Sequence, residues 1–374
     1  MTDLAALDTP AALVDADRLE ANLQRMQAQL DRLGVAFRPH VKTHKCLPVA
    51  ERQRALGARG ITVSTLKEAE SFFDAGFDDI TYAVGLSPDK IGRVLALQRR
   101  GCRLNVLVDS VDGARAIAAA AAPLSVLIEV DVDGLRAGVQ PDSDDLIEVG
   151  RTLHAGGARL QGVLTHYGAS YAQSTPEGLA AAAEQERALC VRAAQRLRAA
   201  GLPCPVVSVG STPTALAAQA LPGVTEVRAG VYVFFDLVIA GTGVCRVDDV
   251  ALSVLTTVIG HRRDRGWAIC DAGWMAMSRD RGTQAQARDC GYGLVCGLDG
   301  HPLPGLQLQQ ASQEHGVIET TDGAPPAAIV QRLPVGTRLR ILPNHACATA
   351  AQHDRYHRLH GTQVDGTWPR FGGW

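Results

Sequence analysis

The sequence predicts an α/β protein made of a (β/α)8 barrel of the TIM type followed by a β-rich C-terminal domain. Eight short apolar stretches recur between residues 36 and 234, and alanine- and leucine-rich stretches of helical character separate them. Strands that alternate with helices in this way are typical of a single barrel. A doubly wound open sheet is the alternative, and the lack of a dinucleotide-binding glycine motif makes it the weaker one.

The expected elements follow in order from the N-terminus. Residues 9–15 predict a strand, and the helix after it carries an apolar stripe with steps of four and three residues, formed by Leu19, Leu23, Met26, Leu30 and Leu33. The barrel strands are expected near residues 36–42, 60–65, 79–84, 105–109, 125–131, 160–168, 206–212 and 226–234. The intervening helices are expected over residues 66–75, 88–99, 111–120, 143–154, 176–200 and 213–220.

The composition changes after about residue 240. Apolar and polar residues alternate in residues 250–259, 267–271 and 337–342, with glycine, proline and aspartate turns between them, which predicts strands. We therefore expect a barrel domain over residues 15–240 and a β-rich domain over residues 241–374, which the N-terminal strand of residues 1–14 joins.

Charge and cysteine usage exclude several classes of protein. The net charge is −2 and 20% of the 374 residues are charged, so nucleic acid and acidic membranes are not expected as partners. The nine cysteines are scattered without a Cys-x-x-Cys pair, which indicates thiols in a reducing compartment. The N-terminus shows no signal peptide. We expect a soluble cytoplasmic protein that acts on a small molecule.

The segment from Arg38 to Lys45, with the sequence RPHVKTHK, suggests a reactive amine. Residues 35–37 read as a buried strand, and Pro39 and Pro48 are expected to keep the chain extended. Lys42 then lies at the carboxyl end of the first barrel strand among other cations. Such crowding favours an amine that forms a Schiff base with a carbonyl cofactor. A solvated basic loop is the alternative.

The ends of the other strands are also rich in polar residues. Around the seventh strand, residues 208–213 offer small residues, hydroxyls and backbone N–H groups just before a helix. Barrels often bind a phosphate after strands seven and eight. An amine at strand one and a phosphate site there together suggest pyridoxal phosphate.

A second cluster lies in the β-rich domain. On an extended segment, His345 and Cys347 would face the same side, and an imidazole with a thiolate suits zinc better than magnesium or calcium. The pair supplies two ligands, so water and substrate would have to take the open positions. A buried cysteine beside a hydrogen-bonded histidine is the alternative. Glu314 and His315 either support this site or close a hairpin.

Five segments, residues 38–45, 62–70, 271–278, 313–316 and 343–347, resemble the D-serine dehydratase and D-threonine aldolase family. Its members are fold-type III pyridoxal-phosphate enzymes built like alanine racemase, and the resemblance runs from Thr9 to the C-terminus. It implies that Lys42 is the Schiff-base lysine and that His345 and Cys347 are metal ligands. It also implies cofactor contacts from Arg136, His166, Tyr171, Ser211, Thr212, Gly230 and Tyr232.

The resemblance further implies a dehydratase of D-3-hydroxy amino acids that uses pyridoxal 5'-phosphate and zinc or another divalent metal such as manganese. D-threo-3-hydroxyaspartate would give oxaloacetate and ammonia, and D-serine would give pyruvate. Cys347 favours this activity, because the aldolase branch carries an aspartate there. The alternatives are an aldolase that releases glycine and an aldehyde, and a non-catalytic pyridoxal-phosphate-binding protein. Racemisation would need a second acid, for which Tyr292 is the candidate. Fold relatives suggest a homodimer.

Overall fold

The computed structural model describes residues 2–374 and separates the chain into two compact units. The barrel unit comprises Gln24–Gly230 with Phe371–Trp374, and the β unit comprises the residues up to Leu23 with Val231–Arg370. These boundaries lie after residues 23 and 230, whereas the sequence suggests residues 14 and 240. Tyr232 therefore belongs to the β unit, two residues after the barrel unit ends.

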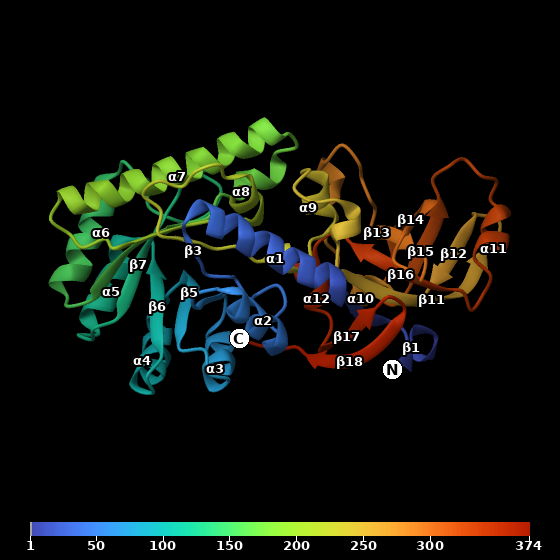
Figure 1. The fold of residues 1–374 in the computed structure, drawn as a ribbon, viewed down its shortest axis with the longest axis horizontal. Coiled ribbons are helices and arrows are strands. Elements are labelled where there is room, and N and C mark those ends of the chain that lie inside the picture. The colour runs from blue at the N-terminus through green and yellow to red at the C-terminus, as the bar shows by residue number, and fades with distance from the viewer. Residues whose placement is uncertain (1) are drawn as a thin grey trace. The chain divides into compact units, whose positions relative to one another are not determined.

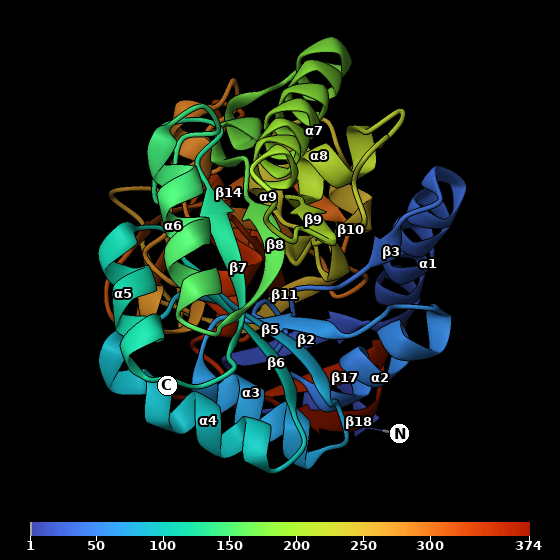
Figure 2. The same cartoon turned by 90° about the vertical axis from the view of Figure 1, so that its left-hand side faces the viewer.

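The barrel unit contains eight parallel strands in the order β3-β10-β9-β8-β7-β6-β5-β4 (Figure 2). The backbone N–H of Thr62 donates to Pro39 O at 2.8 Å, and this links the two ends of that order into a closed barrel. The strands are β3 (Ala36–Phe37), β4 (Ile61–Val63), β5 (Asp79–Gly85), β6 (Arg103–Val108), β7 (Ser125–Val130), β8 (Arg159–Thr165), β9 (Val206–Val209) and β10 (Glu226–Val227).

Helices follow these strands as the helical spacing predicts, and in Figure 2 α4, α5 and α6 lie outside the sheet. Leu107, Leu127 and Leu164 fill part of the apolar interior. The helices are α1 (Ala16–Leu33), which leads into the unit, α2 (Leu47–Leu56), α3 (Leu66–Asp74), α4 (Ile91–Arg99), α5 (Val111–Ala119), α6 (Asp144–Ala155), α7 (Pro176–Ala199) and α8 (Thr212–Ala217). The expected barrel and its six interstrand helices are confirmed.

One local expectation is wrong. Pro48 does not keep the chain extended, because it occupies the first turn of α2. The first N–H groups of a helix have no partner within the helix, so a proline there removes no hydrogen bond, and its fixed φ suits the helical conformation.

The β unit is built on a mainly antiparallel sheet, in which only β2 and β17 pair in parallel among the described strands, and it contains the three expected alternating runs (Figure 1). In it β16 pairs back with β11, so β11, β12, β15, β14, β13 and β16 form a closed ring around buried residues that include Val258, Ile318 and Ile341. Its strands are β1 (Thr2–Asp3), β2 (Ala11–Asp15), β11 (Leu252–Arg262), β12 (Trp267–Cys270), β13 (Gly293–Cys296), β14 (Pro302–Ala311), β15 (Gly316–Thr320), β16 (Arg338–Pro343), β17 (Arg355–His360) and β18 (Gln363–Pro369).

The helices of the β unit are short, and they carry the second cluster of polar residues. They are α9 (Leu237–Gly241), α10 (Trp274–Met277), α11 (Ala328–Arg332) and α12 (Ala346–Ala350). All nine cysteines lie within residues 2–374, none of them forms a disulfide there, and Cys347 alone among them is not fully buried. Within the same residues we find no helix long and apolar enough to cross a membrane.

Candidate functional site

Lys42 lies in a turn directly after the first barrel strand, at its carboxyl end. His40 forms a parallel bridge with Thr62, and the N–H of Val41 donates to Thr62 O at 2.9 Å. The N–H of Lys45 donates to Val41 O at 2.8 Å and closes the turn. The Lys42 side chain is exposed. A primary amine is thus presented at the edge of the barrel where enzymes of this architecture hold reactive groups.

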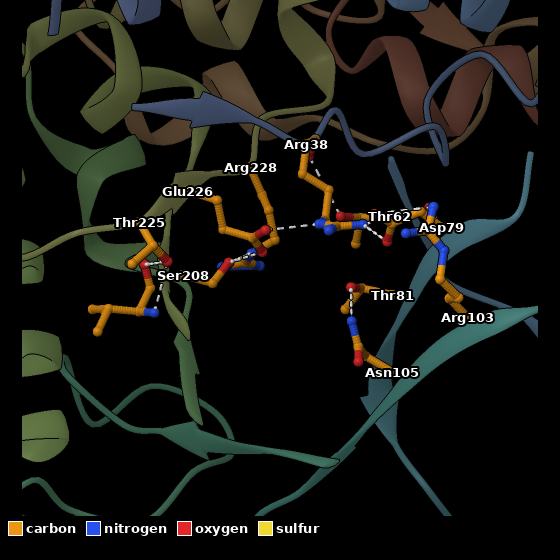
Figure 3. A network of polar contacts seen from close by, with 11 residues as sticks. Arg38, Thr62, Asp79, Thr81, Arg103, Asn105, Ser208, Thr225, Glu226 and Arg228 are labelled. Carbon is orange, nitrogen blue, oxygen red and sulfur yellow. Dashed lines mark hydrogen bonds and ion pairs between the residues drawn. The ribbon is translucent and has the colours of Figure 1, made fainter. Parts of the chain in front are cut away.

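Two of the cations close to Lys42 in sequence, Arg38 and Lys45, are paired with carboxylates. Arg38 donates from Nη1 to Asp79 Oδ1 at 2.7 Å and from Nε to Glu226 Oε2 at 2.8 Å, as Figure 3 shows. Lys45 Nζ lies 2.9 Å from Glu68 Oε1. The crowding expected from sequence is therefore weaker than a count of basic residues suggests, because two of the neighbours are paired.

The carboxylate of Glu226 continues this network across the barrel interior (Figure 3). Ser208 Oγ donates to Glu226 Oε1 at 2.8 Å, and Arg228 Nε donates to Ser208 Oγ at 2.9 Å. Arg228 Nη2 also donates to Thr165 O. Burial lowers the pKa of Arg228, and the Glu226 carboxylate opposes that effect. A buried guanidinium is thus held at the strand ends, and we find no carboxylate in ion-pair contact with it among residues 2–374.

Two imidazoles near Lys42 are neutral. Desolvation is the main reason that the pKa of His40 lies well below its usual value, and the charges of Lys42 and Arg228 lower it further. The same causes, again with desolvation first and then Lys42, lower the pKa of His166 to about 3. His166 Nδ1 lies 3.0 Å from Gly210 O. A neutral imidazole can act as a hydrogen-bond donor or acceptor beside Lys42 without adding positive charge.

The residues expected to bind a phosphate form a buried hydroxyl cluster. Ser211 caps α8, with its Oγ accepting from Thr214 N at 3.3 Å and lying 2.9 Å from Ser170 Oγ. Thr212 is the first residue of α8 and is buried. The Ser211 hydroxyl is thus already hydrogen-bonded within the protein. Ser211 therefore positions the neighbouring residues, in addition to offering a hydrogen-bond donor to a phosphate.

Glu186, on α7, is hydrogen-bonded to the backbone next to that cluster. Its Oε1 accepts from the N–H of Tyr167 and from the N–H of Gly210, each at 3.0 Å. Burial raises the pKa of Glu186 to about 7, although hydrogen bonds from Thr214, Gly210 and Tyr167 act against this. One carboxyl group therefore joins the ends of β8 and β9.

Two glycines allow close approach of the backbone at the strand ends. A Cβ at Gly210, where φ is +134°, would lie 2.1 Å from Arg228 O. A Cβ at Gly230 would lie 3.0 Å from His40 O. Gly210 therefore needs to be glycine, whereas Gly230 is in close contact with the turn that carries Lys42.

The remaining predicted cofactor contacts are divided between the two units. Arg136 is exposed, and its Nη2 lies 3.4 Å from Glu129 Oε1. The charge of Arg136 contributes to the lowered pKa of His166. The Tyr171 ring lies 6.1 Å from the His166 ring, centroid to centroid. Tyr232 is buried in the β unit. The barrel unit thus brings together Lys42, Arg136, His166, Tyr171, Ser211, Thr212 and Gly230 at the carboxyl ends of its strands.

In the β unit, His345 and Cys347 are in hydrogen-bond contact, although not for the reason expected from sequence. His345 is extended and forms the N-cap of α12, whereas Cys347 lies inside the first turn of that helix. The segment is therefore not one extended strand. The change from strand to helix turns the two side chains toward each other.

A carboxylate holds the other side of the imidazole. His345 Nδ1 lies 2.7 Å from Asp280 Oδ2. Burial alone would lower the pKa of His345, but the hydrogen bonds with Asp280 and Cys347 outweigh it and raise that pKa. The hydrogen bond to His345 lowers the pKa of Asp280. A histidine bound to a carboxylate on one nitrogen is the usual arrangement of a metal-binding imidazole.

Two further residues named in the sequence analysis lie elsewhere in the β unit. Glu314 and His315 are exposed in the turn between β14 and β15, where the N–H of Ser312 donates to His315 O at 2.8 Å. They close a hairpin. Tyr292 packs against the core of the β unit, with the Arg281 guanidinium 5.3 Å from its ring centroid.

The donor set fits a metal that uses few protein ligands. Across residues 2–374, no group of three or more histidine, cysteine, aspartate or glutamate side chains is arranged to hold a metal ion. His345 and Cys347 would thus be its two protein ligands, and Asp280 would act on the histidine. An imidazole and a thiolate suit a borderline-soft ion such as zinc.

Comparison with known proteins identifies the family. The profile described as "Alanine racemase, N-terminal domain" matches residues 14–238, and the profile described as "Putative serine dehydratase domain" matches residues 251–359. The chain belongs to the D-serine dehydratase and D-threonine aldolase family. This family assignment agrees with the five segments that resemble it and with the barrel and β unit described above.

Members of this family align with almost the whole chain. It is 61% identical to the D-threo-3-hydroxyaspartate dehydratase of Delftia sp. over 99% of both chains. It is 33% identical to an Arthrobacter D-threonine aldolase, over 94% of this chain and 89% of that protein. A solved structure of a cysteine-to-alanine variant of D-threo-3-hydroxyaspartate dehydratase, in the metal-free form, matches with a TM-score of 0.97 at 61% identity and covers 100% of both chains.

Sequence reasoning missed Glu186 in the barrel unit, and it missed Asp236 and Asp280 in the β unit, which bond to the backbone of Ala346 and to the side chain of His345. Glu186 occupies the same face of α7 as Ala182, Ala183 and Cys190, so an acidic residue in a buried stripe was a signal that could have been used. Asp280 lies two residues beyond a segment that resembles the family, and nothing in its spacing indicates that it reaches His345.

Proposed function

We propose that the chain is a dehydratase of D-3-hydroxy amino acids that depends on pyridoxal 5'-phosphate and a divalent metal, with D-threo-3-hydroxyaspartate as its preferred substrate. The observation that carries this proposal is that one chain holds both an exposed amine at a barrel strand end and a His–Cys pair backed by a carboxylate. The 61% identity with a D-threo-3-hydroxyaspartate dehydratase supports the choice of substrate.

The barrel unit fits pyridoxal phosphate. Lys42 offers the amine for the covalent bond, and Gly210 and Gly230 allow the backbone to approach closely. We assign the phosphate to the segment of Ser211 and Thr212, and the ring to the surroundings of His166, with Arg136, Tyr171 and Tyr232 as further contacts. When bound, pyridoxal phosphate supplies an electron-accepting ring that stabilises negative charge at the substrate Cα.

Lys42 is the residue that we assign to proton transfer. Its Nζ is the base that we assign to the Cα proton of the substrate. His40 and His166 are neutral, so they do not compete with Lys42 as cations. Loss of the Cα proton and of the β-hydroxyl as hydroxide leaves an enamine, and water converts that enamine to a 2-oxo acid and ammonia.

His345 and Cys347 are the residues that we assign to the metal, and we propose zinc. A divalent ion held by this pair would supply Lewis-acid help to the β-hydroxyl of the substrate, which is a poor leaving group without such help. The two-ligand arrangement leaves positions for water and substrate. Asp280 is hydrogen-bonded to the Nδ1 of this imidazole.

An aldolase is the second candidate, because a D-threonine aldolase is 33% identical to the chain. In that reaction a base removes the proton of the hydroxyl group and the Cα–Cβ bond breaks. The likeness to the dehydratase is greater, 61% against 33%, and it favours elimination. We also propose that the protein is a homodimer, as the family resemblance implies, and size-exclusion chromatography with light scattering tests this.

A substrate panel tests the assignment. We expect D-threo-3-hydroxyaspartate to be consumed faster than D-serine and D-threonine when pyridoxal phosphate and zinc are present. If no D-amino acid in the panel is consumed, the result would contradict the proposed enzyme and would favour a non-catalytic protein that binds pyridoxal phosphate. Faster turnover of D-threonine than of the other two would favour the aldolase.

A further inference from the structure

The imidazole of His345 has a fixed partner on its Nδ1 side. Asp280 Oδ2 lies 2.7 Å from that nitrogen, and the other oxygen of the same carboxylate accepts from the N–H of Gly282 at 2.8 Å. The N–H of Asp280 donates to Ser278 Oγ at 3.2 Å. The carboxylate is therefore held at both ends and cannot turn away from His345 without losing these bonds.

This contact determines which nitrogen of His345 is free. A carboxylate only accepts hydrogen bonds, so Nδ1 must carry the proton that is shared with Asp280. A histidine that binds a metal must be neutral, and in that form the lone pair of His345 is on Nε2. Metal-binding histidines commonly show this arrangement, in which the second nitrogen donates to a carboxylate and the ring cannot rotate.

A second carboxylate fixes the backbone between the two ligands. Asp236 Oδ2 accepts from the N–H of Ala346 at 2.9 Å, and Asp236 Oδ1 accepts from the N–H of Ile239 at 2.9 Å. The N–H of Val238 donates to Asn344 O at 3.1 Å. The residues before and between the ligands are thus attached to the start of α9 by two hydrogen bonds.

The helix that carries Cys347 is attached to the segment that leads to Asp280. Thr349 Oγ1 donates to Met277 O at 2.7 Å, and His353 Nε2 lies 3.0 Å from Ala276 O. Two hydrogen bonds therefore join the segment that leads to the carboxylate with the helix of the thiol and the residues after it, so the distance from Asp280 to His345 depends on the fold and not on the two side chains alone.

We propose that Asp280 is the positioning residue of the metal centre, which holds His345 as the Nδ1–H tautomer, while Asp236 fixes the turn between His345 and Cys347. This inference rests on the proposed metal site and adds two residues to it. Neither carboxylate is a ligand in this account. Asp280 acts on the orientation and tautomer of His345, and Asp236 acts on the backbone.

Zinc affinity, measured by competition with a chromophoric chelator, tests this in the full chain loaded with pyridoxal phosphate. We expect Asp280→Ala to weaken zinc binding roughly 10- to 100-fold. Asp280→Asn should bind zinc with intermediate affinity, because its amide oxygen still accepts from Nδ1–H. Asp264→Asn is the matched control, since Asp264 is exposed and pairs only with Arg262 and Arg265 in the described residues. It should bind zinc as the wild type does.

The tautomer of His345 separates positioning from a general loss of structure. In 15N NMR spectra of the zinc-loaded protein with labelled histidine, the wild type should show Nδ1–H with the metal on Nε2, and Asp280→Ala should show a mixture of states. Thermal unfolding of the metal-free variants checks that they fold. Asp236→Asn should weaken zinc binding without changing the tautomer.

The outcomes are distinct. Equal zinc affinity in Asp280→Ala and the wild type would overturn the inference while leaving the metal site in place. A weaker affinity in Asp280→Ala with an unchanged tautomer would also overturn it. Failure of the wild type to bind zinc or any other divalent ion would overturn the proposed metal function, and the inference with it.

Discussion

Lys45 Nζ lies 2.9 Å from the buried carboxylate of Glu68. Lys45 is three residues beyond Lys42, the lysine that we assign to the cofactor. Glu68 also accepts from Ser64 Oγ at 2.7 Å. Lys45 has a left-handed backbone conformation, with φ of +44°, and its own N–H closes the turn. The ion pair thus joins the turn that carries Lys42 to the start of α3.

Removal of this partner should destabilise the barrel unit. We expect Glu68→Gln to lower the free energy of unfolding by about 3 kcal/mol, the low end of the range for breaking a buried pair. Glu70→Gln is the control, because Glu70 lies on the same helix but its pair with Arg93 is partly exposed to solvent, which predicts a loss of about 0–1 kcal/mol. Chemical denaturation measures both. Equal losses in the two variants would contradict the buried role of Glu68.

Lys42 should be required for the covalent attachment of pyridoxal phosphate. We expect Lys42→Ala to lose the visible absorption of the bound cofactor and to lose turnover. Lys67→Ala, which removes another exposed lysine close in sequence, should keep both. Absorption spectra and ammonia release measure the two effects. A Lys42→Ala protein that still turns over substrate would end the assignment.

Metal removal should stop the loss of the β-hydroxyl group without affecting the attachment of pyridoxal phosphate to Lys42. We expect chelation to abolish dehydration while the cofactor absorption persists, because Lys42 and the metal ligands lie in different units of the chain. Added zinc should restore activity to the wild type and not to His345→Ala or Cys347→Ala. Turnover that survives complete metal removal, as checked by elemental analysis, would exclude a role for the ion.

Glu186 should make stability depend on pH. Because its pKa is raised from 4.5 to about 7, the folded state binds the proton more tightly than the unfolded state between these values. The free energy of unfolding should therefore fall as pH rises from 4.5 to 7. We expect Glu186→Gln to show a shallower fall than the wild type in urea titrations at several pH values. Parallel curves would show that Glu186 is not the group responsible.

The sequence predicts the larger features of this molecule well because they depend on periodicity. The alternation of strands and helices, and the place of Lys42 after the first strand, follow from apolar spacing and from the topology of a barrel. The expectation for Pro48 is wrong because proline is common both after the end of a helix and in the first turn of one. Only the residues that follow the proline distinguish the two positions.

The supporting residues of the site could not be predicted for a different reason. Asp280 and His345 are 65 residues apart, and the contact exists because α10 and α12 pack together. The pairing of His345 with Cys347 was expected from an extended segment, yet it arises where a strand gives way to a helix. Local spacing carries no information on such contacts, which depend on the tertiary fold.

The products formed from D-threo-3-hydroxyaspartate test the central claim most directly. With pyridoxal phosphate and zinc present, we predict oxaloacetate and ammonia in equal amounts, measured by a coupled malate dehydrogenase assay and by ammonia determination on the same sample. Glycine and glyoxylate in place of these products would show cleavage of the Cα–Cβ bond and would contradict the dehydratase.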